Sequence, residues 1–300
     1  MDMTQNKCCR HGASLRRRRR RRRKILRSII FSCSIIAVAV FVAVGSRMIT
    51  SGDGGTNKYD VEAGNNTYDN AVIENSKISE KNKIQNNQSM LDDIMNSTQY
   101  PKQLKDLALK NEEALEFVYD YPAEHVKEHT IDLTEEASMD SVPLFVQWDK
   151  RWGYEKYSGN FFAASGCGPT TLSMVVVYLT HNREASPIAV AKYSKEAGYS
   201  VDGSGSSWTL ISEGCMHYGV KAKAVALDES RMKAELDEGH PIVVNVGPGD
   251  FTDTGHFMVI TGYDDEGFSI NDPNSIEKSG KRWLFKNISS QIRAVWSMYV

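Results

Sequence analysis

The sequence predicts an α+β fold for its second half, with helices first and an antiparallel sheet after them. Three observations lead to this prediction. Apolar residues recur with helical spacing after residues 167 and 186, and short runs rich in Val, Ile and Phe begin at residue 241. The segment Asp264-Asp265-Glu266-Gly267 separates two of these runs and has the composition of a hairpin turn.

Basic residues are concentrated at the N-terminus. Residues 1–27 hold 12 of the 36 Lys and Arg residues and one of the 38 Asp and Glu residues, which leaves 24 basic and 37 acidic residues in the remainder. The acidic remainder argues against nucleic acid as a partner. Residues 29–45 form an apolar run that, together with Ser28 and Ser46, approaches the ~20 residues that span a bilayer core.

Because Lys and Arg stay on the cytoplasmic side, the basic block predicts the topology of the chain. We expect a cytoplasmic Arg-rich tail (1–27), a single transmembrane helix (28–47) that anchors the chain in the cell membrane, and an extracellular remainder. A cleaved signal peptide is the alternative, but no clear small-residue cleavage site follows the apolar run.

Two segments separate the apolar run from the α+β part. Residues 48–98 are rich in Asn, Ser, Asp, Gly and Lys without a period, so we expect a disordered linker. From Pro101 to Tyr121 the apolar residues have the spacing of an amphipathic helix. We interpret residues 99–140 as a helical N-terminal extension of the following domain, with a role as an inhibitory segment over the cleft as an open alternative.

Residues 141–300 form the predicted α+β domain. Proline in the first turn favours two of its helices, and glycine follows the ends of three. The strands are short apolar runs. The predicted helices are 167–181, 186–198, 207–219 and 228–238, and the predicted strands are 241–246, 256–263 and 267–271.

The candidate nucleophile is Cys167, in Ser165-Gly166-Cys167-Gly168-Pro169-Thr170. A cysteine on the first turn of a helix lies near free backbone N–H groups and the positive end of the helix dipole, which favour the thiolate. A thiolate attacks an acyl carbon, whereas a neutral thiol does so poorly. A disulfide between Cys167 and Cys215 is the competing interpretation.

His256 and Asp272 are the candidate partners of this thiol. His256 opens an apolar strand, and Asp272 follows the return strand of the same predicted hairpin. A hairpin of this length brings both residues to the same end. His256 would act as general base and then as acid, and Asp272 would fix the tautomer and orientation of the ring.

Further residues are candidates for binding the substrate. Gly166 and Gly168 lack side chains and would let a substrate backbone approach the thiol, and Gly255 lies next to His256. Trp208 would line a subsite, or it is a core aromatic residue. The backbone N–H of Cys167 would supply one oxyanion donor and Gln147 a second; a surface-loop position for Gln147 is the alternative.

Taken together, five motifs resemble the bacterial C39-like peptidase family, relatives of the double-glycine leader peptidases of bacteriocin exporters. The resemblance covers residues 141–300 and implies a papain-like cysteine peptidase fold, with Cys167, His256 and Asp272 catalytic and a Gln in the oxyanion hole. In the exporter peptidases that Gln lies close before the Cys, where this chain has Phe161. No transporter domain follows, so leader cleavage during export is not implied. The motifs are residues 147–152, 165–170, 247–251, 255–257 and 271–275.

The sequence therefore predicts a membrane-anchored, extracytoplasmic cysteine peptidase that hydrolyses peptide or amide bonds through an acyl-enzyme. Its expected substrate is a peptide or the peptide part of peptidoglycan. The alternatives are a catalytically silent papain-like module that binds peptide or cell wall, and an acyl transferase of the transglutaminase or transpeptidase type. We expect no cofactor and no metal, because His125 and His129 have no third ligand at a convincing spacing.

Overall fold

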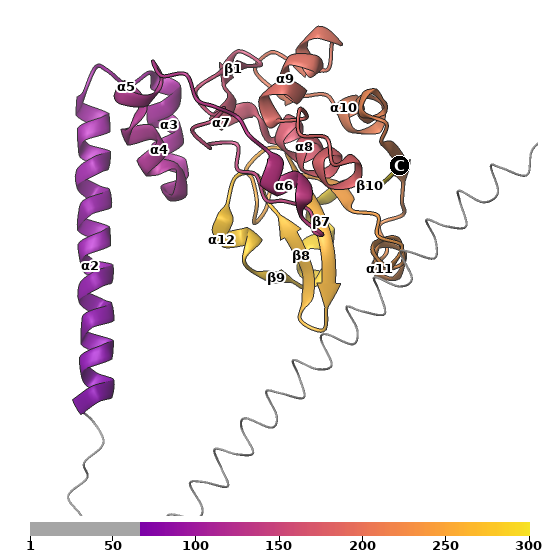
Figure 1. The fold of residues 1–300 in the computed structure, drawn as a ribbon. Helices are drawn as coiled ribbons and strands as arrows, with labels where there is room; N and C mark the ends of the chain where they lie inside the picture. The colour runs from indigo at the N-terminus through magenta and orange to yellow at the C-terminus, as the bar shows by residue number, and fades with distance from the viewer. Residues whose placement is uncertain (1–66) are drawn as a thin grey trace, which may run out of the picture. The chain divides into compact units, whose positions relative to one another are not determined.

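The computed structural model describes the backbone of residues 67–300 and the side chains of residues 79–300 (Figure 1). Residues Asn70–Val300 form one compact unit, and the features below belong to residues 67–300. The expected cytoplasmic tail (1–27) and transmembrane helix (28–47) lie outside the described residues. Within residues 67–300, none of the helices combines the length and the apolar character needed to cross a bilayer.

Helix α2 (Thr67–Asn96) differs from the disordered linker expected over residues 48–98. No Pro or Gly interrupts residues 67–96, so the polar composition is compatible with a helix. The last turns of α2 gain tertiary contacts, since Ile94 is fully buried and Met90 and Leu91 pack against the same apolar cluster. Such packing, rather than intrinsic propensity, usually stabilises a helix.

The N-terminal extension is a series of short helices rather than the single helix expected from residue 101 to 121. The break is at Asn111, whose backbone is extended and whose side chain accepts a hydrogen bond from the Glu113 N–H at 3.0 Å. Asn is a favoured residue at helix starts for this reason. The helices are α3 (Lys102–Lys110), η1 (Glu112–Ala114), α4 (Leu115–Tyr119), α5 (Tyr121–Glu124) and α6 (Thr134–Ser138).

The helical part of the α+β domain is built around α8 (Cys167–Thr180). Three predicted helices are confirmed, with small differences at their ends. The third predicted helix, 207–219, is instead a short α-helix followed by a 3-10 turn, because the chain departs from helical geometry at Glu213. The elements are α7 (Phe162–Ser165), α8, α9 (Pro187–Glu196), α10 (Thr209–Ser212), η2 (Gly214–Tyr218) and α11 (Glu229–Asp237).

A six-stranded antiparallel sheet follows, with the strand order β5-β10-β6-β7-β8-β9. The three predicted strands are confirmed, and the last strand, β10, lies between β5 and β6. The strands are β5 (Lys221–Ala224), β6 (Ile242–Val246), β7 (His256–Asp264), β8 (Gly267–Asn271), β9 (Arg282–Trp283) and β10 (Ile292–Tyr299). The remaining elements are the two-stranded pairs β1 (Lys156–Tyr157) with β2 (Asn160–Phe161) and β3 (Ser200–Val201) with β4 (Gly205–Ser206), and α12 (Ile276–Ser279), α13 (Phe285–Ile288) and η3 (Ser289–Gln291).

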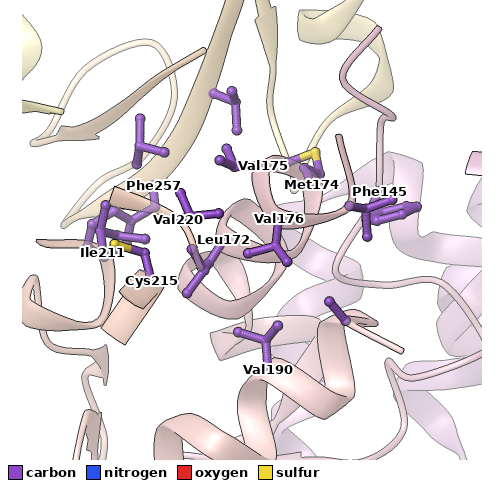
Figure 2. Close-up of a cluster of buried hydrophobic side chains, with 14 of the residues drawn as sticks. Phe145, Leu172, Met174, Val175, Val176, Val190, Ile211, Cys215, Val220 and Phe257 are labelled. Carbon is purple, nitrogen blue, oxygen red and sulfur yellow. The ribbon is translucent and has the colours of Figure 1, made fainter. Parts of the chain in front are cut away.

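Alternate residues of the central strands supply two apolar clusters, one on each face of the sheet. Val243 belongs to the larger cluster. In this cluster Phe257 joins Leu172 and Val176 of α8 (Figure 2). The neighbouring residues of these strands, among them Val244, belong to the second cluster, which includes Met232 of α11. The α+β prediction is thus confirmed, and burial of α8 against the sheet fixes the place of its first residue, Cys167.

Candidate active site

Cys167 is the first residue of α8 and directly follows Gly166, the N-cap residue. No side chain caps this end of the helix by a hydrogen bond. The thiol is half-buried and free, and Cys215 is a buried free thiol, so the alternative disulfide between them is absent from the structure. Because no side chain caps the first turn of α8, its backbone N–H groups remain available to the Cys167 sulfur. The predicted position of Cys167 at a helix start is therefore confirmed.

His256 is the first residue of β7 and pairs with Val246 of β6. Two buried hydrogen bonds hold this end of the strand. The Thr171 Oγ1 donates to the Phe257 carbonyl at 3.1 Å, and the Asn245 Nδ2 donates to the His256 carbonyl at 3.2 Å. The first of these joins α8 to β7 within a few residues of both Cys167 and His256, and so fixes the thiol relative to the ring.

Asp272 follows β8 and lies beside His256. The ring Nε2 of His256 is 2.7 Å from the Asp272 Oδ1, and both side chains are buried. The register of the hairpin, which pairs Val259 with Asn271, brings the two side chains to the same end of the sheet. With Nε2 facing the carboxylate, Nδ1 is the ring nitrogen left for the thiol.

The ionisation of the thiol and the ring is coupled. Burial by itself would raise the pKa of the Cys167 thiol, but its hydrogen bond to the His256 ring and the charge of that ring lower the pKa below the usual value. Burial opposes the charge on His256 as well, yet the Asp272 carboxylate and then the Cys167 sulfur raise the pKa of the ring. The geometry therefore favours a thiolate–imidazolium pair.

Cys215 provides a contrast within the same domain. Burial without a charged partner raises the pKa of its thiol to about 11. The thiol belongs to the apolar cluster under α8 (Figure 2). A buried thiol of this kind is a small apolar residue rather than a nucleophile.

Gln147 is a buried residue and not a surface-loop residue, because only 5% of it is exposed. Its backbone N–H donates to the Pro273 carbonyl at 2.7 Å, and its Nε2 donates to the Ala163 carbonyl at 2.7 Å. Ala163 lies in α7, which directly precedes Cys167. The amide thus lies between the segment before Cys167 and the segment after Asp272. An amide nitrogen has two N–H bonds, and the hydrogen bond to Ala163 uses one of them.

Gly166 and Gly168, the two glycines beside the thiol, were expected to leave open space for a substrate backbone, but they pack against side chains of the protein. A Cβ atom at Gly168 would lie 2.5 Å from the Ser206 Oγ, and one at Gly166 would lie 2.5 Å from the Phe162 ring. Both positions are therefore filled by the protein's own side chains, and packing alone explains the glycines. A Cβ at Gly255 would have open space, with the nearest atom at 4.0 Å. Contact of these residues with a substrate stays a prediction.

Trp208 is a half-exposed aromatic residue near this site. It follows Ser206 closely in the chain, 48% of it is exposed, and its ring meets the ring of Trp296 edge-on at 6.1 Å. Trp208 is thus not a core aromatic residue. Its role in a subsite stays a prediction.

Tyr157 and Ser206 are two further residues of the site that the sequence does not predict. The Tyr157 hydroxyl is 2.6 Å from the Ser206 Oγ and 2.8 Å from the Ser194 Oγ. Burial and, to a smaller extent, the charge of Cys167 raise the pKa of Tyr157. These hydroxyls come from separate segments of the chain. Neither residue belongs to a motif, and only the fold brings them to Gly168.

The histidines considered as metal ligands have backbone partners. The His125 Nδ1 is 2.6 Å from the Tyr121 carbonyl, and the His129 Nε2 is 3.2 Å from the Glu124 carbonyl. Within residues 67–300 there is no group of three or more His, Cys, Asp and Glu side chains arranged to hold a metal ion.

This chain is similar to one protein family and to solved structures. The model of a family described as the Peptidase_C39 like family matches residues 139–300. No curated protein matches the sequence. One similar solved structure is the peptidase domain of Streptococcus ComA, a bi-functional ABC transporter involved in a quorum sensing pathway, with 19% identity, 53% of this chain and 96% of that chain covered, and a TM-score of 0.38. Another is a protein from Bacillus anthracis described as a C39-like peptidase, with 16% identity, 53% and 95% coverage, and a TM-score of 0.34.

Proposed function

Because this chain belongs to the Peptidase_C39 like family, we propose that it is a cysteine peptidase that hydrolyses peptide or amide bonds. Cys167 is the nucleophile, His256 is the general base and acid, and Asp272 orients the ring. The observation that supports this proposal is the contact of a helix-start thiol with a buried imidazole whose far nitrogen lies 2.7 Å from a carboxylate.

The mechanism begins with the thiolate–imidazolium pair. The Cys167 sulfur attacks the carbonyl carbon of the scissile bond, and the carbonyl oxygen becomes an oxyanion. The backbone N–H of Cys167 and the remaining N–H of Gln147 are the proposed donors to this oxyanion. Collapse of the tetrahedral species breaks the C–N bond, and the His256 imidazolium protonates the leaving amine. An acyl-enzyme remains.

Water then attacks the acyl-enzyme. His256, now neutral, removes a proton from the water molecule, and the new C–O bond forms as the C–S bond breaks. The products are the free acid and the thiolate, again paired with the imidazolium. Asp272 keeps the same ring orientation in both half-reactions, because its hydrogen bond is made to Nε2 and leaves Nδ1 free for proton transfer.

The proposed place of action is outside the cell membrane. The support for this placement is the sequence, in which the Arg-rich residues 1–27 precede the apolar run of residues 29–45. A domain tethered in this way meets secreted peptides and the peptide part of the cell wall. Either is a substrate of the proposed chemistry.

The test is alkylation of the full-length protein with iodoacetamide between pH 5 and pH 9, with peptide mapping to locate the label. We expect Cys167 to react at a rate that stays nearly constant down to acidic pH, and the His256→Ala variant to lose this reactivity. Cys215 serves as an internal control, because its raised pKa predicts slow labelling throughout. Labelling of Cys167 that rises only toward the pKa of a free thiol, about 8.5, would refute the peptidase and favour a silent peptide-binding module.

A second measurement separates hydrolysis from acyl transfer. The acyl-enzyme is common to both reactions, so its formation does not distinguish them. Added amine also intercepts the acyl-enzyme of a hydrolase in competition with water, so the quantity measured is the ratio of new amide to free acid at low amine concentration. Free acid should predominate for a hydrolase, and a new amide should predominate for an acyl transferase.

A further inference from the structure

Asp272 is the first residue of a turn that leads into α12. The turn and the carboxylate are joined by hydrogen bonds, since the backbone N–H of Asn274 donates to the Asp272 Oδ1 at 2.8 Å. The Asp272 N–H in turn donates to the Ser279 Oγ at 2.9 Å. The oxygen that accepts from Asn274 is the one that faces His256, so the position of this turn sets the direction of the carboxylate.

The N-terminal extension contacts this turn through Glu113. One carboxylate oxygen of Glu113 accepts hydrogen bonds from the backbone N–H of Ile276 at 2.7 Å and of Glu277 at 3.1 Å. The other oxygen accepts from the Ser275 hydroxyl. The carboxylate thereby satisfies the first N–H groups of α12, although it lies more than 160 residues away along the chain.

Asn111 contacts the same turn one residue earlier. Its Nδ2 donates to the Asn274 carbonyl at 2.9 Å and to the Asn274 Oδ1 at 3.1 Å. Its own Oδ1 accepts from the Glu113 N–H at 3.0 Å. Asn111 therefore holds both Asn274 and the backbone that carries the Glu113 carboxylate.

The turn is also attached to the segment of the oxyanion candidate. The Trp148 Nε1 donates to the Asn274 carbonyl at 3.2 Å, and the Gln147 N–H donates to the Pro273 carbonyl at 2.7 Å. A displacement of the turn would therefore move the partner of His256 and the backbone of Gln147 together.

On the basis of the proposed function, we propose that Asn111 and Glu113 are positioning residues of the peptidase. They hold the turn of residues 272–279 so that the Asp272 carboxylate remains on His256. The N-terminal extension is in this case a part of the active enzyme. This role is opposite to the inhibitory role left open for residues 99–140, because removal of the extension would reduce activity rather than release it.

The test compares two adjacent glutamates in the full-length protein. Glu113→Ala removes the contacts with the turn, whereas Glu112→Ala removes a surface contact, the hydrogen bond from Asn87 at 2.7 Å. The measurements are the rate of Cys167 alkylation from pH 4 to pH 9 and the thermal midpoint Tm. A loosened Asp272 stabilises the imidazolium less, and the imidazolium then stabilises the thiolate less. We therefore expect the acidic midpoint of labelling to rise in Glu113→Ala and to stay unchanged in Glu112→Ala.

At pH 5 we expect Cys167 to be labelled about three- to tenfold more slowly in Glu113→Ala than in the wild type. A shift of one pKa unit changes the thiolate fraction about tenfold. In an Asp272→Asn background, Glu113→Ala should add little, because the carboxylate that it positions is already neutral. Glu113→Gln keeps one acceptor oxygen and should give a smaller shift, and it replaces Glu113→Ala if that variant does not fold.

Two results would overturn the positioning role. One is a folded Glu113→Ala protein whose labelling profile matches the wild type, and the other is an equal effect of Glu113→Ala with and without the Asp272 charge. Both leave the peptidase proposal intact, because the wild-type profile still depends on His256. A wild-type profile with no reactivity at acidic pH would instead refute the proposed function, and the positioning role with it.

Discussion

The Nε2 of His256 and the Oδ1 of Asp272 are 2.7 Å apart, and no more than 6% of either residue is exposed. The second carboxylate oxygen, Oδ2, is buried and has no hydrogen-bond partner within the described residues. A buried carboxylate with an unsatisfied oxygen is costly unless a positive charge faces it. This pair therefore favours the charged form of the ring, which in turn favours the thiolate of Cys167.

His256 should remain protonated well above the pH at which a free imidazole loses its proton, about 6.5. The physical reason is that the Asp272 carboxylate and the Cys167 sulfur outweigh the effect of burial and raise the pKa of the ring. NMR spectra of the histidine rings between pH 5 and pH 10 would show this directly, with His256→Ala used to assign the signal. A His256 ring that is neutral at pH 8 would contradict the ion pair.

Asp272→Asn should slow the labelling of Cys167 at pH 5 by at least about tenfold, which corresponds to one pKa unit. The amide keeps the shape of the carboxylate but lacks the charge that stabilises the imidazolium. Asp264→Asn is the matched control, because Asp264 lies in the same hairpin and binds Arg282 at 2.7 Å on the surface. Identical profiles for the two variants would exclude an electrostatic role of Asp272.

Gln147→Ala should weaken binding of a peptide aldehyde, which forms an oxyanion on attack by the thiolate. Loss of one oxyanion donor typically costs about 10²- to 10³-fold in rate. Alkylation by iodoacetamide forms no oxyanion and should change little. A parallel loss in both reactions would mean that Gln147 supports the local structure and does not bind the oxyanion. Gln147 is buried, so Tm is measured alongside.

Gly168→Ala should destabilise the fold by about 1–3 kcal/mol, the usual cost of overpacking. The new Cβ would lie 2.5 Å from the Ser206 Oγ and 2.7 Å from the Ser206 Cβ. Ser206→Gly removes both atoms, at the loss of the hydrogen bond to Tyr157. The double variant should therefore be more stable than the sum of the single variants predicts, as measured by urea unfolding. Additive effects would show that the helix start moves to make room.

The parts of the site that the sequence predicts are those set by local patterns. Cys167 is at a helix start because Pro169 and the apolar run after it favour a helix, and the Asp264–Gly267 turn brings His256 and Asp272 together. The contacts of Glu113 could not be predicted, because nothing near residue 113 indicates a partner at residue 276. The surroundings of Gly168 depend likewise on Ser206, which the fold brings in from another segment.

Two larger elements, α2 and β10, could also not be predicted from patterns in the sequence. Helix α2 has few apolar residues, and its end is stabilised by burial of Ile94 against a cluster that forms only in the folded chain. Strand β10 has no regular alternation: four residues in a row, Val295–Met298, are buried. Its two faces are covered because an apolar cluster lies on each side of the sheet, with Trp296 and Met298 in one and Val295 in the other. Its position between β5 and β6 follows from topology and not from local preference.

The place of β10 in the sheet has a consequence for biosynthesis. β10 (Ile292–Tyr299) pairs with β6 on one side and β5 on the other. A growing chain that has reached β8 can form the hairpin of His256 and Asp272, but β6 still has one open edge and β5 has no partner. The sheet that supports α8 closes only when residues 292–299 have left the ribosome. Completion of the sheet is thus a late event in the folding of the chain, as expected for strongly non-local pairing.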